Sequence, residues 1–298
     1  MSEEMEPVMS EWSTEAVIPD RRSSAPVFSD LECKLPEKLC RGGTTCRHPE
    51  RPGRVDPVAL DNIRRANLPT TRVRVGASDT SLDLWYVDLD VRADGVRRFR
   101  EWLSCDELAK AERFHSDLDR ARYIVGRAAL RGVLAAGLDC SPAAIRFSYG
   151  TNGKPKLEGG HGGVDFNLAH SGGDAVIAVA DGAAVGVDIE LFRPIADVES
   201  LARLVFSDVE RRALALAPDP VSAFLNGWTR KEAYVKALGL GLTAPLMEIT
   251  VSLSERAKLL STGLPDQSVS TWRLLNVPHP RAIVALALGP GLESIRAT

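Results

Sequence analysis

Two acidic side chains alternate with apolar ones in a short hydrophobic stretch, where Asp188 and Glu190 lie between Val187, Ile189 and Leu191. On a strand, neighbouring side chains point to opposite faces, so both carboxylates share one face, roughly 7 Å apart, and the apolar side chains share the other. Two such charges repel unless a cation lies between them, and carboxylate oxygens suit a hard divalent ion such as Mg²⁺. Taken alone, the pair fits a solvated strand face as well as a metal site.

An aromatic residue, an acid and a base follow at intervals of four: Trp228, Glu232 and Lys236. This spacing places them on one face of a helix. The tryptophan at the start of the row indicates that the row is not fully solvated, so Glu232 can be a third metal ligand and Lys236 a partner for a phosphate. The alternative is an exposed helix with an ion pair worth only a few tenths of a kcal/mol.

A set of cations precedes these acids in the chain. Arg127 and Arg131 are four residues apart on a predicted helix, Lys154 precedes a proline in a turn, and His170 lies at the end of a predicted strand. Three oxygen ligands for Mg²⁺ together with these cations indicate a site for an anionic, phosphate-rich ligand. Each cation alone also fits ordinary surface charge.

The elements that must position these residues follow from hydrophobic periodicity. We expect helices over residues 101–114, 118–138, 199–216 and 221–239, the third with a break at Ser207–Asp208 and the last ending at Gly239. We expect strands over residues 82–91, 145–150, 164–171, 175–181, 183–192, 249–254, 269–277 and 282–289. This order predicts an α+β (α/β) protein with two lobes of similar plan, an N-terminal lobe at 80–185 and a C-terminal lobe at 186–298.

Length and composition exclude several classes of protein. The chain has 298 residues, enough for about two domains. Its net charge of −3, from 37 basic and 40 acidic residues, argues against a protein that coats nucleic acid. No apolar run reaches the ~18–20 residues that span a bilayer, and the acidic start of the chain lacks the apolar region of a signal peptide. We therefore expect a cytoplasmic protein that binds neither nucleic acid nor membrane, with its five cysteines reduced.

Residues 1–79 differ from the remainder of the chain. They hold eight of the 18 prolines and no long apolar-periodic stretch, so they cannot bury enough apolar area to offset their chain entropy. We expect a disordered N-terminal extension, with a short helix near residues 58–67. A zinc site is the alternative for one cluster in this extension, although its spacing fits no CxxC pattern; the cluster consists of Cys33, Cys40, Cys46 and His48.

Five motifs in order resemble those of the 4′-phosphopantetheinyl transferases of the Sfp type. They are Gly126-Arg127-x-x-Leu130-Arg131, Gly153-Lys154-Pro155, Phe166-Asn167-Leu168-Ala169-His170-Ser171, Gly186-Val187-Asp188-Ile189-Glu190, and the W-x-x-K-E-A-x-x-K-x-x-G run from Trp228 to Gly239. The resemblance covers roughly residues 80–290. One departure is Ala169, where the family often has a serine or threonine whose hydroxyl can contact the cofactor phosphate.

The resemblance implies a fold of two similar lobes related by a pseudo-twofold, with coenzyme A in the cleft between them. It also implies a functional monomer, because one chain carries both lobes. The implied reaction is Mg²⁺-dependent transfer of the 4′-phosphopantetheine group of coenzyme A to a serine of an apo acyl or peptidyl carrier protein, with adenosine 3′,5′-bisphosphate released. Carriers of polyketide or nonribosomal peptide synthases are common substrates of this type of enzyme.

The resemblance assigns roles to the residues singled out above. Asp188, Glu190 and Glu232 would hold Mg²⁺, Glu232 would act as base directly or through a water, and Lys236 would stabilise the transferring phosphate. The residues implied to contact coenzyme A are Lys110, Arg127, Lys154 and His170.

Two other functions remain open from the sequence. The first is a non-catalytic coenzyme A or nucleotide-binding protein on the same scaffold, although a binder needs no complete acid trio with a lysine beside it. The second is a Mg²⁺-dependent phosphohydrolase, which fits three carboxylates but not the order of the motifs.

Overall fold

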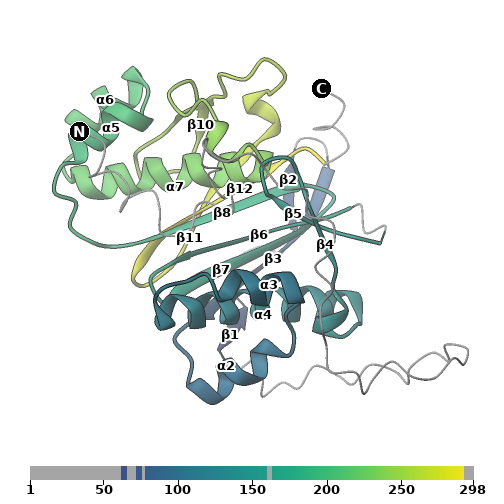
Figure 1. The fold of residues 1–298 in the computed structure, drawn as a ribbon. Helices are drawn as coiled ribbons and strands as arrows, with labels where there is room; N and C mark the ends of the chain where they lie inside the picture. The colour runs from purple at the N-terminus through teal and green to yellow at the C-terminus, as the bar shows by residue number, and fades with distance from the viewer. Residues whose placement is uncertain (1–61, 66–71, 76–77, 160–162, 292–298) are drawn as a thin grey trace, which may run out of the picture.

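The computed structural model describes residues 62–65, 72–75, 78–159 and 163–291 (Figure 1). Of the extension predicted to be disordered, residues 1–79, positions 1–61, 66–71 and 76–77 lie outside the described residues. The cluster of Cys33, Cys40, Cys46 and His48 lies outside them too. No helix in the described ranges is long and apolar enough to cross a membrane.

The first part of the described chain forms a helix-on-sheet unit. Its antiparallel sheet has the order β1-β3-β7-β6, and β2 pairs with the beginning of β3. The strands are β1 (Ile63–Arg65), β2 (Arg72–Val75), β3 (Ser78–Asp88), β6 (Val164–Ser171) and β7 (Asp174–Asp181). One face of this sheet carries α4 (Asp117–Leu138), against which α2 (Ala93–Arg100) and α3 (Cys105–Ala111) pack. A short hairpin of β4 (Phe147–Tyr149) and β5 (Pro155–Leu157) connects α4 to β6.

The second part repeats this plan. Its antiparallel sheet has the order β11-β12-β8, from β8 (Ala184–Leu191), β11 (Arg273–Val277) and β12 (Ala282–Gly289). The long helix α7 (Pro220–Leu238) covers one face of this sheet, and α5 (Val198–Val205) and α6 (Asp208–Ala215) pack against α7. The remaining pair is β9 (Thr250–Val251) with β10 (Leu259–Ser261), and short 3-10 turns span Pro142–Ala144, Gly241–Thr243 and Val269–Thr271.

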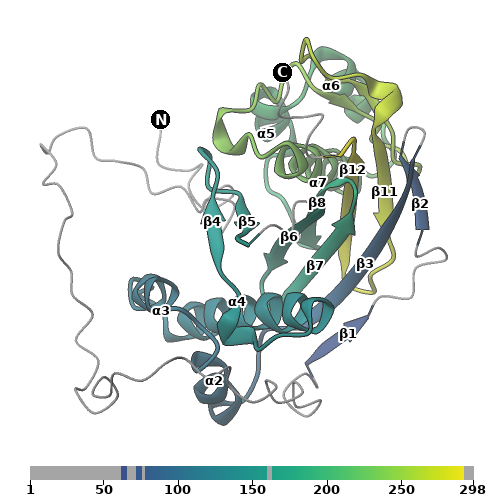
Figure 2. The same cartoon turned by 90° about the vertical axis from the view of Figure 1, so that its right-hand side faces the viewer.

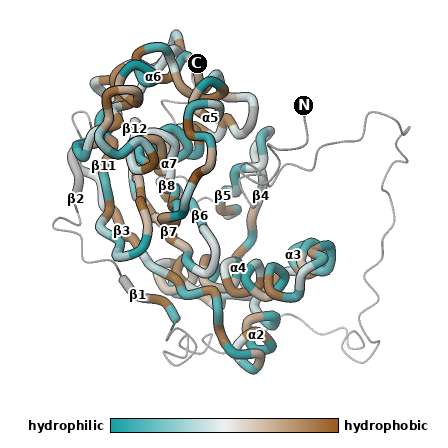
Figure 3. The backbone as a smooth tube through the Cα atoms, turned by 90° about the vertical axis from the view of Figure 1, so that its left-hand side faces the viewer, coloured by the Kyte–Doolittle hydropathy of each residue, from teal (hydrophilic) through white to brown (hydrophobic). Residues whose placement is uncertain are grey.

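The two sheets pack face to face, which gives the molecule four layers, helix, sheet, sheet and helix (Figures 1 and 2). The core between the sheets takes side chains from both units, among them Leu84, Val176, Val187 and Leu286, all buried. Figure 3 shows hydrophobic residues running through the central strands, while the outer helices α2 and α3 mix hydrophobic and hydrophilic residues. The chain is thus a mixed α+β protein of two similar helix-and-sheet units joined by one shared core.

The ends of α7 are set by local sequence. Asp219 caps its first turn by accepting from the backbone N–H of Ser222, and Pro220 occupies the first helical position, where no N–H is needed. Gly239 ends the helix in the left-handed conformation, at φ 70°, as the sequence predicts. The predicted break at Ser207–Asp208 is also present, because Ser207 and Glu210 form a capping box that starts α6.

Two local predictions are wrong. Residues 63–65 form strand β1 rather than part of a helix. The strand pairs with β3, and Ile63 packs against the hydrophobic core between α4 and the first sheet. The sheet therefore begins before the predicted lobe boundary at residue 80. The helix predicted over residues 101–114 is shorter: only α3 (Cys105–Ala111) falls in this range, because Ser104 starts it through a capping box with Glu107. Helix α2 lies wholly before the predicted range.

Candidate active site

Strand β8 places its two carboxylates on the face that α7 covers. Val187 and Ile189 are buried in the core between the sheets, as the alternation predicts. The even-numbered positions face the helix: a Cβ on Gly186 would lie under 3.0 Å from the carbonyl oxygen of Ala233 and the backbone nitrogen of Ala237. The missing side chain at Gly186 therefore lets α7 approach the strand that carries Asp188 and Glu190.

Helix α7 brings the predicted row of side chains onto this strand. Trp228 Nε1 donates to Glu190 Oε1 at 3.0 Å, and Lys236 Nζ donates to Asp188 Oδ1 at 2.6 Å. Trp228 is buried against Phe206 and its neighbours, so the row is not a solvated face. The structure thus brings together the strand pair and the helix row that the sequence analysis treated separately.

Burial disfavours negative charge in this carboxylate cluster, which consists of Asp188, Glu190 and Glu232. It raises the pKa of Glu190 to about 7, and the charge of Asp188 adds to the shift. It likewise raises the pKa of Glu232 to about 7 and raises the pKa of Asp188. For Lys236, burial opposes the charged form, but the three surrounding carboxylates outweigh it and raise the lysine pKa. Three acids around one ammonium leave an excess of negative charge.

The composition of the cluster fits a hard divalent cation. Asp188 Oδ2 is buried and has no hydrogen-bond partner among the described residues, and a buried acceptor of this kind is costly unless a ligand satisfies it. Carboxylate oxygens are the ligands that Mg²⁺ prefers. No three His, Cys, Asp or Glu side chains in the described ranges already converge as a coordination set, and Lys236 takes the other oxygen of Asp188. The donor set therefore suits Mg²⁺, but side chains must turn to bind it.

The first unit contributes His170 to the same region. This histidine lies near the end of β6, and its pKa is lowered to about 3 by burial and then by the charges of Lys236 and Arg122. Arg122, on α4, is held by Asp90 through two hydrogen bonds of 2.7 and 2.9 Å. Arg122 is not among the residues predicted from the sequence. Its place on the long predicted helix is the only sequence signal for it, because Asp90 lies 32 residues away.

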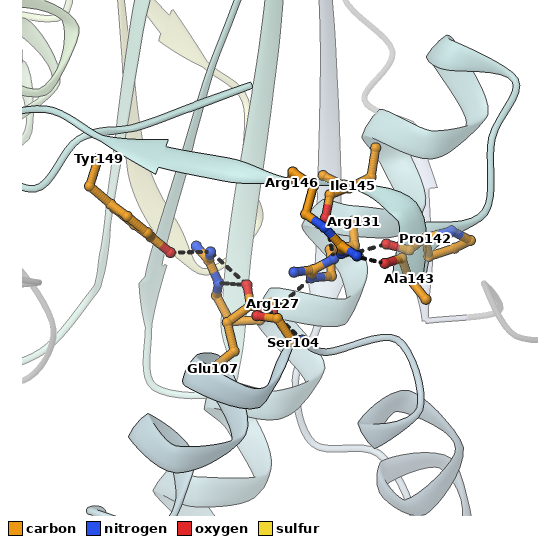
Figure 4. A network of polar contacts seen from close by, with 9 residues as sticks. All are labelled: Ser104, Glu107, Arg127, Arg131, Pro142, Ala143, Ile145, Arg146 and Tyr149. Atoms are coloured by element: carbon orange, nitrogen blue, oxygen red, sulfur yellow. Dashed lines mark hydrogen bonds and ion pairs between the residues drawn. The ribbon is translucent and has the colours of Figure 1, made fainter. Parts of the chain in front are cut away.

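Arg127 belongs to a buried network on the outer side of the first unit (Figure 4). Its Nε and Nη2 donate to Glu107 Oε1 at 2.9 and 2.7 Å, and Nη2 also donates to the Tyr149 hydroxyl at 3.2 Å. Arg131 donates to Glu107 Oε2 at 2.7 Å and to two backbone carbonyls. Burial alone would raise the pKa of Glu107, but Arg127, the backbone of Ser104 and Arg131 hold it below its usual value. Contact of Arg127 with coenzyme A stays a prediction.

The other two predicted cations also have partners within the protein. Lys154 is partly buried and donates to Asp165, to Val185 O and to Ala237 O. Lys110 Nζ lies 5.7 Å from the ring centroid of Tyr123, on the surface formed by α3 and α4. Ala169, the departure from the family pattern, is buried in the core between the sheets.

Comparisons with known proteins agree with this site. A sequence profile described as the 4′-phosphopantetheinyl transferase superfamily matches residues 184–287, which include the whole carboxylate cluster. The 4′-phosphopantetheinyl transferase HetI of Nostoc sp. is 38% identical over 212 residues, which cover 69% of this chain and 86% of HetI. The 4′-phosphopantetheinyl transferase Sfp of Bacillus subtilis is 32% identical over 187 residues, covering 61% of this chain and 80% of Sfp.

One solved structure shows a weaker likeness. A holo-[acyl-carrier-protein] synthase of Thermotoga maritima overlaps with 36% of this chain and 64% of its own, at 23% identity and a TM-score of 0.29.

Proposed function

The chain belongs to the 4′-phosphopantetheinyl transferase superfamily and transfers 4′-phosphopantetheine from coenzyme A to carrier proteins, and we propose that it does so at the carboxylate cluster with Lys236. The observation that carries the proposal is the buried cluster itself. Three carboxylates, two of them with a pKa raised to about 7, surround one ammonium, and one buried oxygen has no partner in the described part of the chain. A divalent cation would neutralise the negative charge of the carboxylates, and the bound cation would then attract an anionic ligand.

Asp188, Glu190 and Glu232 would hold Mg²⁺ in this proposal. Bound Mg²⁺ would neutralise the pyrophosphate of coenzyme A and orient the phosphorus for attack. The indole N–H of Trp228 holds Glu190 in place by a hydrogen bond of 3.0 Å to Oε1. The second carboxylate oxygen of Glu190 would then be left for the ion. Lys236, which pairs with Asp188 at 2.6 Å, would stabilise the charge on the transferring phosphate.

Glu232 acts as the base for the incoming serine. Its carboxylate accepts the hydroxyl proton, directly or through a water. The serine oxygen forms a bond to the phosphorus of the phosphopantetheine arm, and the bond to the bridging oxygen breaks. The leaving group is adenosine 3′,5′-bisphosphate, and the hydroxyl proton remains on Glu232.

The cationic face of the site would receive the nucleotide end of coenzyme A. Arg122 is close enough to His170 for its charge to lower the histidine pKa. A phosphate bound between the two side chains would raise that pKa again and favour the protonated histidine. We include Arg127 and Lys110 in this face as the family resemblance implies. For Lys154, the turn at Gly153–Pro155 would contact the nucleotide through its main chain.

The carrier protein would approach over the beginning of the second unit. Phe192 follows Glu190 by two residues and is 56% exposed, and Leu204 on α5 is 48% exposed. Exposed apolar side chains on the unit that carries the metal ligands suit contact with a protein surface that presents its serine. A monomer suffices for this reaction, because His170 comes from the first unit and the carboxylates from the second.

The test is loss of transfer in two variants that keep the fold. Asp188→Ala and Glu232→Gln should abolish the mass gain of one phosphopantetheine on an apo carrier in the presence of coenzyme A and Mg²⁺, while thermal unfolding remains cooperative. The matched control is Asp266→Ala, an exposed acid far along the chain, which should transfer at the wild-type rate. Wild-type rates in either cluster variant at saturating Mg²⁺ would exclude the metal assignment.

The same assay separates the two alternatives. Coenzyme A hydrolysed without a carrier would indicate a phosphohydrolase, and binding of coenzyme A without transfer to any apo carrier would indicate a binding protein. A panel of apo carriers from polyketide, nonribosomal peptide and fatty-acid synthases would identify the preferred partner.

A further inference from the structure

Side chains, rather than a backbone ladder, join the edges of the two sheets. Strands β6 and β8 lie side by side (Figures 1 and 2), yet within the described chain β6 pairs only with β7 and β8 only with β12. Three backbone N–H groups of β8 donate to side chains of β6: Val185 to Asp165 at 2.7 Å, Val187 to Asn167 at 2.8 Å and Leu191 to Ser171 at 3.2 Å. The constant offset of 20 residues means that one register holds β8 along its length.

Lys154 extends this connection to helix α7. Its ammonium donates to Asp165 Oδ2 at 2.6 Å, to Val185 O at 3.0 Å and to Ala237 O at 3.1 Å. A lysine has three N–H donors, and these three acceptors use all of them. Asp165 Oδ2 in turn accepts from both Lys154 and the backbone of Val185. One ion pair therefore joins β6, the start of β8 and the last turn of α7.

The carboxylate cluster depends on the elements that this ion pair connects. Asp188 lies three residues beyond Val185 on β8, and Lys236 directly precedes Ala237 on α7. The cluster has ligands on both elements, so a shift of α7 along β8 would change the spacing between Glu232 and Asp188. His170 lies on β6, the third element held by the pair.

We propose that Lys154 and Asp165 are positioning residues for the transfer reaction, and that their ion pair sets the spacing of the carboxylate cluster without touching coenzyme A. The proposal rests on the proposed function of that cluster. In this proposal the Lys154 side chain positions the cluster, whereas the family resemblance implies that it contacts coenzyme A. The two roles can be distinguished by experiment, because Asp165 takes part in positioning but not in contact with coenzyme A.

The single variants Lys154→Met and Asp165→Asn distinguish these tasks. We expect each to lower kcat and to raise the Mg²⁺ concentration for half-saturation by roughly tenfold, the lower end of what residues that orient metal ligands contribute. The KM for coenzyme A should stay within about twofold of wild type, as should the dissociation constant of coenzyme A measured directly by calorimetry. Lys156→Met, two residues further on and also partly buried, is the matched control and should leave all four quantities unchanged.

The double variant Lys154→Met/Asp165→Asn separates positioning from simple loss of stability. Each single variant leaves one buried polar or charged partner uncompensated, which is strongly destabilising. The double variant removes both charges, and the asparagine oxygen can still accept from Val185. We therefore expect its melting temperature to recover toward wild type, while kcat and the Mg²⁺ dependence stay impaired, because the bonds from Lys154 to Val185 and Ala237 are absent.

Two results would overturn the proposal. One is a KM for coenzyme A that rises about tenfold in Lys154→Met and not in Asp165→Asn, which would place the lysine on the substrate. The other is recovery of kcat together with melting temperature in the double variant, which would make the pair merely structural. Failure of the proposed function itself has a separate signature, since Asp188→Ala would then transfer normally.

Discussion

Glu190 and Glu232 link the charge state of the cluster to the stability of the whole protein. Their pKa values rise from 4.5 to about 7 on folding, so the folded state binds protons more tightly than the unfolded state. The stability they contribute is fully present below about pH 4.5 and is lost as the pH rises through about 7. We expect the free energy of unfolding of the metal-free protein to fall over this range. Added Mg²⁺ should restore more of it at about pH 8 than at about pH 5.5, where protons compete for the carboxylates.

Denaturant unfolding at these two pH values, with and without Mg²⁺, measures this difference. The control is Glu190→Gln/Glu232→Gln, which removes both titrating groups and should flatten the pH dependence and the response to Mg²⁺. Equal stabilisation by Mg²⁺ at both pH values would contradict the assignment of these carboxylates to the ion.

The site residues that the sequence predicts are those that lie together on one strand or on one helix. Asp188 and Glu190 follow from strand alternation, and Glu232 and Lys236 from helical spacing, so their faces could be predicted before any fold was known. Arg122 could not be found in this way, because its relation to His170 and Asp90 exists only after α4 packs on the sheet. The ion pair of Arg127 could not be predicted either, because its partner Glu107 lies 20 residues earlier on another helix.

Helix α7 and strand β8 work as one unit because their backbones touch. A Cβ at Gly186 would lie under 3.0 Å from backbone atoms of Ala233 and Ala237, which cannot move aside as a flexible side chain can. We expect Gly186→Ala to push α7 off the strand and to cost about 1–3 kcal/mol of unfolding free energy, the usual range for overpacking. Transfer activity should fall further than stability alone explains, since Glu232 moves away from Asp188.

Denaturant unfolding and carrier modification at a temperature well below melting test this prediction. Gly137→Ala is the matched control, because Gly137 lies on the exposed side of α4 and its new Cβ would meet nothing within 4 Å. That control should gain roughly 0.8–1 kcal/mol from helix propensity and keep full activity. A Gly186→Ala variant with wild-type kcat would mean that the close approach does not position the cluster.

Elements with strong periodicity and clear caps could be predicted from the sequence, and elements defined by pairing could not. α4, α7, β6 and β12 agree closely with the expected ranges because their apolar patterns and end signals are local. The strand β1 and the helix α2 were missed. A three-residue strand depends on the edge of β3 for its existence, and short helices carry too few residues to show a period.

The two units share so much core that they should unfold together. The cluster between the sheets contains Leu84 of β3 and Val176 of β7 from the first unit, and Val187 of β8 and Leu286 of β12 from the second. The order of helices and strands in the sequence predicts two lobes, but it cannot show that the lobes bury their sheets against each other. Neither sheet can separate from the other without exposing this core. A substitution that destabilises one unit should therefore also destabilise the other.

Leu84→Ala tests this coupling across the whole molecule. Leu84 is 1% exposed, so its truncation should cost about 2–5 kcal/mol, and calorimetry should still record a single transition at a lower temperature. Amide hydrogen exchange should show protection falling as much in β12 of the second unit as in β7 of the first, since both strands line the same core. Leu216→Ala is the control, because Leu216 is 85% exposed and its truncation should change stability by less than about 0.5 kcal/mol. Loss of protection confined to β7, or a second calorimetric transition, would mean that the units fold independently and that the carboxylate cluster can persist when the first unit has opened.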